Sequence, residues 1–130
     1  MNIVITGCLG HIGSALIREL PNLIPGCEIT GIDNLRSQRY CSLFNLPKDH
    51  FTFVEGDVRS VDLINVFRGS DIVIHLAAIT DAASSFDNAQ ELEENNFLST
   101  KAVAEACIVS KVKLISLSST SVYGTQNGVV

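Results

Sequence analysis

Three glycines near the amino terminus have the spacing of a loop that binds phosphate groups. Gly7, Gly10 and Gly13 follow the apolar run Ile3-Val4-Ile5 and open a stretch with helical periodicity. A side chain at Gly7 or Gly10 would obstruct a phosphate approaching the main chain, and one at Gly13 would hold the helix away from the strand. The first N–H groups of a helix are unpaired and carry partial positive charge, so the loop predicts a pyrophosphate site.

A carboxylate stands where such a loop needs one. Asp33 follows Gly13 by 20 residues and ends a second apolar run. A carboxylate there can accept hydrogen bonds from both ribose hydroxyls of NAD, and it repels the 2′-phosphate of NADP. Alternatively, Asp33 is a solvated turn residue before Asn34, and Arg36 could tolerate NADP. With the glycine loop, Asp33 predicts a dinucleotide site that prefers NAD.

Two further strand ends carry polar side chains. Asp57, after a third apolar run, could accept a hydrogen bond from the amino group of adenine, or it could cap a helix over 58–67. His75 ends a fourth run, and the small pair Ala77-Ala78 would let a cofactor ribose lie against the main chain. We expect His75 to be a packed or hydrogen-bonded residue rather than a catalyst. The three histidines lie in unrelated contexts, so no metal site is predicted.

A hydroxyl-rich segment follows a fifth apolar run, and its sequence is Ser118-Ser119-Thr120-Ser121-Val122-Tyr123-Gly124. Ligands of parallel α/β sheets lie at the carboxyl ends of the strands, so these hydroxyls would face the cofactor. A hydroxyl there can polarise a substrate oxygen and help a nearby base take its proton. Alternatively, the hydroxyls satisfy loose backbone groups.

Apolar periodicity predicts strands that alternate with helices, and hence an α/β parallel sheet covered on both sides. The predicted strands are 2–5, 28–33, 51–55, 71–76 and 112–117. The first predicted helix carries Ile12, Ala15, Leu16 and Leu20 and ends at Pro21; a short one lies near 61–67; residues 34–50 form a loop with one helical turn at 42–46. A long helix covers 88–110, with Leu92, Asn96, Ser99, Val103 and Ala106 on one face.

Length and charge favour one cytoplasmic domain over residues 1–130. A chain of 130 residues that is 46% hydrophobic can bury one core. The net charge of −5, without a basic cluster, argues against a nucleic-acid partner. The first strand leaves no room for a signal peptide, and the apolar runs are far shorter than the ~20 residues that span a bilayer.

The four cysteines have no spacing typical of a zinc site or a redox dithiol. We expect Cys8, Cys27, Cys41 and Cys107 to be reduced packing residues in a reducing compartment. Alternatively, Cys8 is reactive because the nearby helix N-terminus stabilises its thiolate.

Six segments occur in the order and spacing of a known family. They are Thr6-Gly7-x-x-Gly10-x-Ile12-Gly13, Asp33-Asn34-Leu35, Gly56-Asp57-Val58, His75-Leu76-Ala77-Ala78, Asn95-Asn96-x-x-Ser99-Thr100 and Ser118-Ser119-x-x-Val122-Tyr123-Gly124. The chain thereby resembles the N-terminal part of the extended short-chain dehydrogenase/reductases, specifically the nucleotide-sugar epimerases and dehydratases. The resemblance implies a Rossmann-like, doubly wound parallel sheet of about five strands, an NAD cofactor, a nucleotide-sugar substrate, and a homodimer formed through the long helix.

The resemblance also implies a role for each matching position. The expected cofactor contacts are Gly7, Gly10, His11, Ile12 and Gly13 at the pyrophosphate; Asp33, Asn34 and Leu35 at the adenosine ribose; Asp57 and Val58 beside adenine; and Leu76, Ala77, Ala78, Thr80 and Asn95 near the nicotinamide ribose. Ser119 matches the catalytic Ser/Thr, which in relatives hydrogen-bonds the sugar hydroxyl that is oxidised.

Two departures from the family pattern matter. The Tyr-x-x-x-Lys pair that supplies the general base is missing, because Phe44 and Asn127 stand four residues after Tyr40 and Tyr123. We therefore expect the base and the substrate region to lie in a longer protein, and this chain to be inactive alone. Thr120-Ser121 replaces the Asp-Glu of sugar 4,6-dehydratases, which favours an epimerase. The alternative function is a non-catalytic NAD(P)-binding module or redox sensor.

Overall fold

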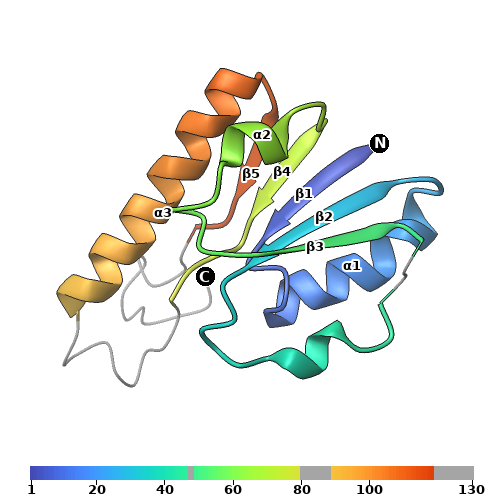
Figure 1. Ribbon diagram of the computed structural model, residues 1–130, viewed down its shortest axis with the longest axis horizontal. Helices are drawn as coiled ribbons and strands as arrows, with labels where there is room; N and C mark the ends of the chain where they lie inside the picture. The colour runs from blue at the N-terminus through green and yellow to red at the C-terminus, as the bar shows by residue number, and fades with distance from the viewer. Residues whose placement is uncertain (47–48, 80–88, 119–130) are drawn as a thin grey trace, which may run out of the picture.

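The computed structural model describes residues 1–46, 49–79 and 89–118. Five parallel strands form a single sheet (Figure 1). The strands are β1 (Asn2–Thr6), β2 (Glu28–Asp33), β3 (Phe51–Glu55), β4 (Ile72–His75) and β5 (Lys113–Ser116). All five predicted strands are confirmed, with ends that differ by at most two residues.

The helices lie on the two faces of the sheet. They are α1 (His11–Leu23), α2 (Leu63–Phe67) and α3 (Ala89–Ser110), with a short 3-10 helix, η1 (Tyr40–Leu43), between β2 and β3. Figure 1 shows α1 on one face and both α2 and α3 on the other. The Rossmann-like, doubly wound architecture is therefore confirmed.

The strand order β3-β2-β1-β4-β5 places the point where the chain reverses direction between β1 and β4. The chain runs outward from β1 to β3, then crosses back and continues outward on the other side through β4 and β5. In doubly wound sheets, connections on opposite sides of such a point diverge, and ligands bind beyond the carboxyl ends of the strands there. In this chain those strands are β1 and β4.

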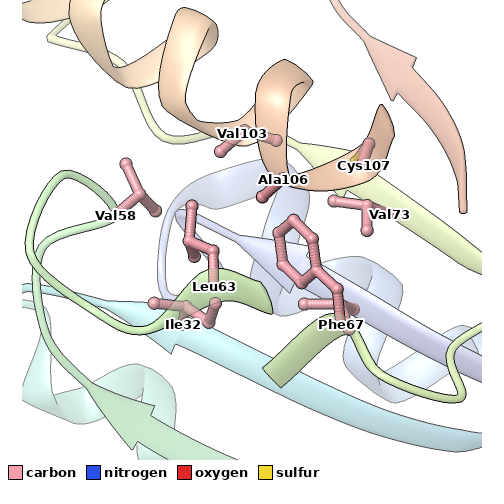
Figure 2. Close-up of a cluster of buried hydrophobic side chains, with 9 residues drawn as sticks. Ile32, Val58, Leu63, Phe67, Val73, Val103, Ala106 and Cys107 are labelled. Carbon is pink, nitrogen blue, oxygen red and sulfur yellow. The ribbon is translucent and has the colours of Figure 1, made fainter. Parts of the chain in front are cut away.

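Alternating side chains of each strand supply two separate cores. Ile3 and Ile5 of β1 pack toward α1, whereas Val4 packs toward α2 and α3. Figure 2 shows Leu63 and Phe67 of α2 directed toward α3 in the second core. The residues buried there are Val4, Ile32, Val58, Leu63, Phe67, Val73, Val103, Ala106 and Cys107.

The predicted end of α1 is wrong, whereas Leu16 and Leu20 pack against the core on that face of the sheet. The helix passes through Pro21 and ends at Leu23. Proline lacks an N–H, but this close to the end of a helix it forfeits only one backbone hydrogen bond. The buried residues are Gly13 and Ile17, while Ile12 is 55% exposed. Gly13 packs against the main chain of Gly7 and Cys8 in the loop before the helix.

Two smaller differences concern the ends of elements, and a third concerns the exposure of β5. The helical turn after β2 is at Tyr40–Leu43 rather than 42–46. Helix α2 begins at Leu63, so its preceding residue is Asp62. All residues of β5 are exposed, because β5 is an edge strand that α3 covers only in part.

The predicted inner face of α3 is confirmed in the described residues, since Ser99, Val103 and Ala106 are buried and Asn96 is half-buried. Among the described residues, no helix has the length and apolar character needed to cross a membrane.

Candidate functional site

The sheet brings four of the predicted segments to one edge. In the strand register Thr6 pairs with Ile32 of β2 and with His75 of β4, and Asp33 pairs with Glu55 of β3. The glycine loop, Asp33, Asp57 and the segment after His75 therefore lie at neighbouring carboxyl ends. This is the edge of the sheet at which ligands bind in doubly wound folds, near the point between β1 and β4 where the strand order reverses.

Most amides of the glycine loop are already paired within the protein. The N–H groups of Gly7 and Cys8 donate to the Ile32 carbonyl, at 2.8 and 3.3 Å. Leu9 donates to Asp33 Oδ2 at 3.0 Å, and Gly10 donates to the Gly7 carbonyl at 3.1 Å. The loop is thus held rigidly against the end of β2.

The free donors are the first three N–H groups of α1. The first helical hydrogen bond runs from Ser14 to the Gly10 carbonyl, at 2.9 Å. Within residues 1–46, 49–79 and 89–118, the N–H groups of His11, Ile12 and Gly13 have no hydrogen-bond partner. Gly10 precedes the helix without a capping side chain. Unpaired amides at a helix start attract an anion, so these three donors suit a phosphate.

The glycines are required for contacts within the protein. Gly7 has a φ of +66°, and a Cβ there would lie 2.7 Å from the main chain of Leu76. A Cβ on Gly13 would lie 2.6 Å from the Gly7 carbonyl oxygen, whereas one on Gly10 would meet that oxygen at 3.2 Å. Gly7 therefore lets the loop touch the end of β4.

Asp33 joins the loop to the end of β2 and keeps acceptor positions open. Its Oδ2 accepts the N–H of Leu9 at 3.0 Å, and its Oδ1 accepts that of Leu35 at 2.9 Å. Leu35 has a φ of +57°, in the left-handed region, two residues after Asp33. A carboxylate has about four lone-pair positions, so about two remain. Asp33 is half-buried in this arrangement, unlike a solvated turn residue.

Asp57 has a different environment. Arg59 donates to its Oδ1 from both the main-chain N–H, at 2.9 Å, and Nε, at 2.8 Å. Its Oδ2 accepts from Nη2 of Arg59 at 2.8 Å and from Nδ2 of Asn34 at 3.1 Å. These hydrogen bonds, chiefly from the Arg59 side chain, hold the pKa of Asp57 well below its usual range. Asp57 does not cap α2, because Asp62 precedes that helix and accepts from Asn65 at 3.1 Å. Asp57 caps the turn at 58–60 instead, where its carbonyl accepts the N–H of Ser60 at 2.9 Å.

His75 is buried in a hydrogen-bonded chain between the sheet and α3. Thr6 Oγ1 lies 2.7 Å from Nδ1, and Thr100 Oγ1 lies 3.2 Å from Nε2. Thr6 Oγ1 also accepts the N–H groups of Leu76 and Ala77, so its own proton must go to Nδ1. His75 is then the neutral tautomer that donates from Nε2, and burial lowers its pKa. The expected packed, hydrogen-bonded role of His75 is confirmed.

Asn96 and Thr100 were identified in the sequence, but the hydrogen bonds that they make were not foreseen. Asn96 accepts the N–H of Ile79 at 2.8 Å and donates to its carbonyl at 3.0 Å, which ties the segment after β4 to α3. Its neighbour Asn95 is half-buried and donates to Asn96 Oδ1 at 3.3 Å. Thr100 makes the hydrogen bond to His75. Both residues belong to the Asn95–Thr100 motif, whose pair of asparagines was the available signal.

The other predicted positions divide into two groups. Leu76 and Ala77 are half-buried, Ala78 is exposed, and Val58 is buried in the core of Figure 2. Thr80 and Ser119 lie outside the described residues, as do the hydroxyls that follow Ser119. In the part of the chain that the structure describes, no three His, Cys, Asp or Glu side chains gather in a way that could hold a metal ion.

The reactive-cysteine alternative is wrong. Cys8 is fully buried, and burial, with the adjacent charge of Asp33, raises the pKa of its thiol to about 12. Desolvation therefore outweighs the helix N-terminus. Cys27 and Cys107 are also buried, as expected of packing residues, but Cys41 is exposed.

Comparison with known proteins agrees with this geometry. The profile of the NAD dependent epimerase/dehydratase family matches residues 3–129. The chain belongs to this family. The resemblance noted in the sequence is thereby confirmed, and so is the Rossmann-like fold.

Individual relatives are enzymes of nucleotide-sugar metabolism. A trifunctional UDP-glucose 4,6-dehydratase/3,5-epimerase/reductase of Arabidopsis thaliana is 39% identical over 133 residues, covering 95% of this chain and 19% of that protein. The structure of UDP-N-acetylglucosamine 4-epimerase from Methanobrevibacter ruminantium, in complex with UDP-N-acetylmuramic acid, has 32% identity and a TM-score of 0.85, covering 97% of this chain and 40% of that one.

The structure of UDP-glucuronic acid 4-epimerase from Bacillus cereus, in complex with UDP-glucuronic acid and NAD, has 32% identity and a TM-score of 0.84. It covers 100% of this chain and 44% of that one. The chain thus spans less than half the length of these matched proteins.

Proposed function

We propose that this chain forms the NAD site of an enzyme that acts on a nucleotide-sugar, most simply an epimerase. Two observations carry the proposal. Among the described residues, the N–H groups of His11, Ile12 and Gly13 have no partner, and the Asp33 carboxylate accepts two hydrogen bonds, which leaves about two acceptor positions. Donors for a pyrophosphate beside acceptors for ribose hydroxyls are what a dinucleotide requires. Membership of an NAD dependent family supports the same cofactor.

The residues at the sheet edge would each bind one part of the cofactor. The amides of residues 11–13 would hold the pyrophosphate, and Asp33, with Asn34 and Leu35 beside it, would hold the adenosine ribose. Asp57 and Val58 would flank adenine. The segment from Leu76 to Thr80, which Asn96 ties to α3, would lie with Asn95 along the nicotinamide ribose.

Bound NAD accepts a hydride from a sugar carbon and can return it. This chain would orient the cofactor. Ser119 would hydrogen-bond the sugar hydroxyl, which loses its proton when the carbon that carries it gives up the hydride. The Tyr-x-x-x-Lys base and the sugar-binding residues would come from a longer protein, as the length of the relatives suggests. The epimerase assignment, a homodimer and a cytoplasmic location are parts of this proposal.

Calorimetric titration with NAD and with NADP tests the cofactor site. NAD should bind more tightly than NADP, because the Asp33 carboxylate opposes a 2′-phosphate. The variant Asp33→Asn should bind NAD about tenfold to a hundredfold more weakly, since it loses charge-assisted hydrogen bonds. The difference between its affinities for NAD and NADP should also be smaller than in the wild type. Asp49→Asn, which removes an exposed carboxylate elsewhere, is the matched control. Undetectable NAD binding by the wild-type chain would refute the proposal.

A further inference from the structure

The connection between β2 and β3 is fastened to the glycine loop and to α1 by two polar side chains. Ser42 of η1 donates its hydroxyl to the Leu9 carbonyl at 3.0 Å. Arg18 of α1 donates from Nη2 to the carbonyls of Ser42 and Phe44, each at 3.2 Å. Its Nη1 donates to the Ser14 carbonyl at 2.6 Å. These contacts hold η1 beside the start of α1 (Figure 1).

The connection needs this fastening because part of its backbone is held in costly conformations. Leu35, Gln38 and Asn45 have φ values of +57°, +52° and +57°, in the left-handed region that residues other than glycine adopt at a cost in free energy. Leu43 and Leu46 pack, with Leu35, against the core on the α1 face of the sheet. Apolar packing and the guanidinium together therefore hold a conformation that the backbone alone would not favour.

The Ser42 hydroxyl acts on the peptide group that leads into α1. This group joins Leu9 to Gly10, and both of its polar atoms are paired. The carbonyl accepts from Ser42, and the Gly10 N–H donates to the Gly7 carbonyl at 3.1 Å. Because a peptide group is planar, hydrogen bonds at both of its polar atoms fix its rotation. Gly10 has no side chain to restrict its backbone, so the Ser42 contact fixes the orientation from which the free amides of residues 11–13 begin.

We propose that Ser42 is a positioning residue for the pyrophosphate of the cofactor, and that Arg18 supports it. The inference rests on the proposed function, since it concerns the amides that would hold the pyrophosphate. Ser42 fixes the peptide group before the helix, and Arg18 keeps Ser42 within reach of Leu9 by holding its carbonyl. Phosphate oxygens are acceptors, so a bound pyrophosphate does not compete with Ser42 for the Leu9 carbonyl.

Titration of the full chain with NAD and with ADP tests the role of Ser42. Ser42→Ala should weaken the binding of both ligands to the same extent, about threefold to tenfold, because both contain the pyrophosphate. Ser42→Thr keeps the hydroxyl and should give dissociation constants within about twofold of the wild type. Ser110→Ala is the matched control, since it removes from the last residue of α3 a hydroxyl that has no hydrogen-bond partner among the described residues. It should leave both dissociation constants unchanged.

Urea denaturation of Ser42→Ala separates positioning from stability. A lower free energy of unfolding with unchanged dissociation constants would overturn the inference, because the hydroxyl would then serve the fold alone. A loss confined to NAD, with ADP binding as in the wild type, would overturn it too. A wild-type chain that binds neither NAD nor ADP would refute the proposed function itself.

A double-mutant cycle tests whether Arg18 acts through Ser42. Arg18→Ala alone should weaken NAD binding about threefold or more, but in the Ser42→Ala background it should cause less than about twofold further loss. An arginine that bound a phosphate directly would give the same loss in both backgrounds, and this result would overturn the inference for Arg18. Arg68→Ala, which removes an exposed arginine at the end of α2, is the control and should bind NAD as the wild type does.

Discussion

At the scale of single residues, two aspartates of the same sheet edge have opposite chemistry. Asp33 accepts two main-chain N–H groups and keeps about two acceptor positions, whereas Asp57 accepts four hydrogen bonds. The difference comes from the residue two positions on. After Asp33 this residue is Leu35, which offers only a backbone donor, whereas after Asp57 it is Arg59, which donates from its side chain as well. Residue type alone does not separate the two roles.

His75 makes the stability of the protein depend on pH. Its folded-state pKa is lowered by burial, so below about pH 6.5 the unfolded chain binds a proton more readily than the folded one. The free energy of unfolding should therefore fall as the pH drops from 7 to 5, by at most about 1.4 kcal/mol per pH unit from this residue. Urea denaturation across this range measures the slope.

The variant His75→Gln provides the comparison for this pH effect. A glutamine amide can accept from Thr6 and donate to Thr100, but it does not titrate. The pH slope of the variant should be smaller than that of the wild type. Equal slopes in the two proteins would show that His75 is not the titrating group.

Cysteine reactivity should follow burial rather than position in the loop. Cys41 is exposed, whereas Cys8 is buried with a pKa raised to about 12. A thiol reagent at pH 8 should therefore modify one thiol per chain quickly and the others only on unfolding. Cys41→Ser should remove the fast phase and Cys8→Ser should not. A fast phase that survives in Cys41→Ser would contradict the assignment.

At the scale of elements, the loop between β1 and α1 depends on close packing of its glycines. An alanine Cβ at position 13 would lie 2.6 Å from the Gly7 carbonyl oxygen, but one at position 10 would lie 3.2 Å from it. Gly13→Ala must push α1 away from the loop. It should cost about 2 kcal/mol of stability and weaken NAD binding, while Gly10→Ala should have a clearly smaller effect on stability.

Denaturant unfolding and NAD titration of these two glycine variants are the measurements. Measuring both quantities in both variants shows whether a loss of stability is accompanied by weaker NAD binding. We expect this in Gly13→Ala, because the amides of residues 11–13 move with the helix. Equal loss of stability in the two variants would mean that the loop relaxes freely around either methyl group.

At the scale of the whole molecule, the two hydrophobic cores on opposite faces of the sheet fix the positions of the strand ends that form the site. Phe67 is fully buried between the sheet and α3, and Ile64, on the same short helix, is 45% exposed. Phe67→Ala should lower the free energy of unfolding by about 3–5 kcal/mol, because it leaves a cavity. Ile64→Ala, the control, should cost much less. Thermal or urea unfolding measures both, and similar losses would show that α2 is not packed as described.

The family, the fold and the strands could all be predicted from the sequence, because apolar runs and glycine spacing are local signals. The end of α1 could not, since Pro21 lies close enough to the terminus to be tolerated. The burial of Gly13 beside Cys8 and Gly7 could not be predicted either, since it depends on how the loop and the helix pack together. The hydrogen bonds of Asn96 and Thr100 were missed because their partners, Ile79 and His75, are distant in sequence.

The sequence by itself determined which segments meet at one edge of the sheet, since parallel strands place their carboxyl ends together. The order of the strands, β3-β2-β1-β4-β5, came from the tertiary structure. Only the tertiary structure decided which polar groups there remain available. Hydrogen bonds to β2 use the amides of residues 7–9, and nearby and distant donors together use the oxygens of Asp57, whereas the amides of residues 11–13 and part of Asp33 have no partner among the described residues. Whether a polar group can still bind a ligand depends on every hydrogen-bond partner that the folded chain brings to it, and the order of residues in the sequence does not give those partners.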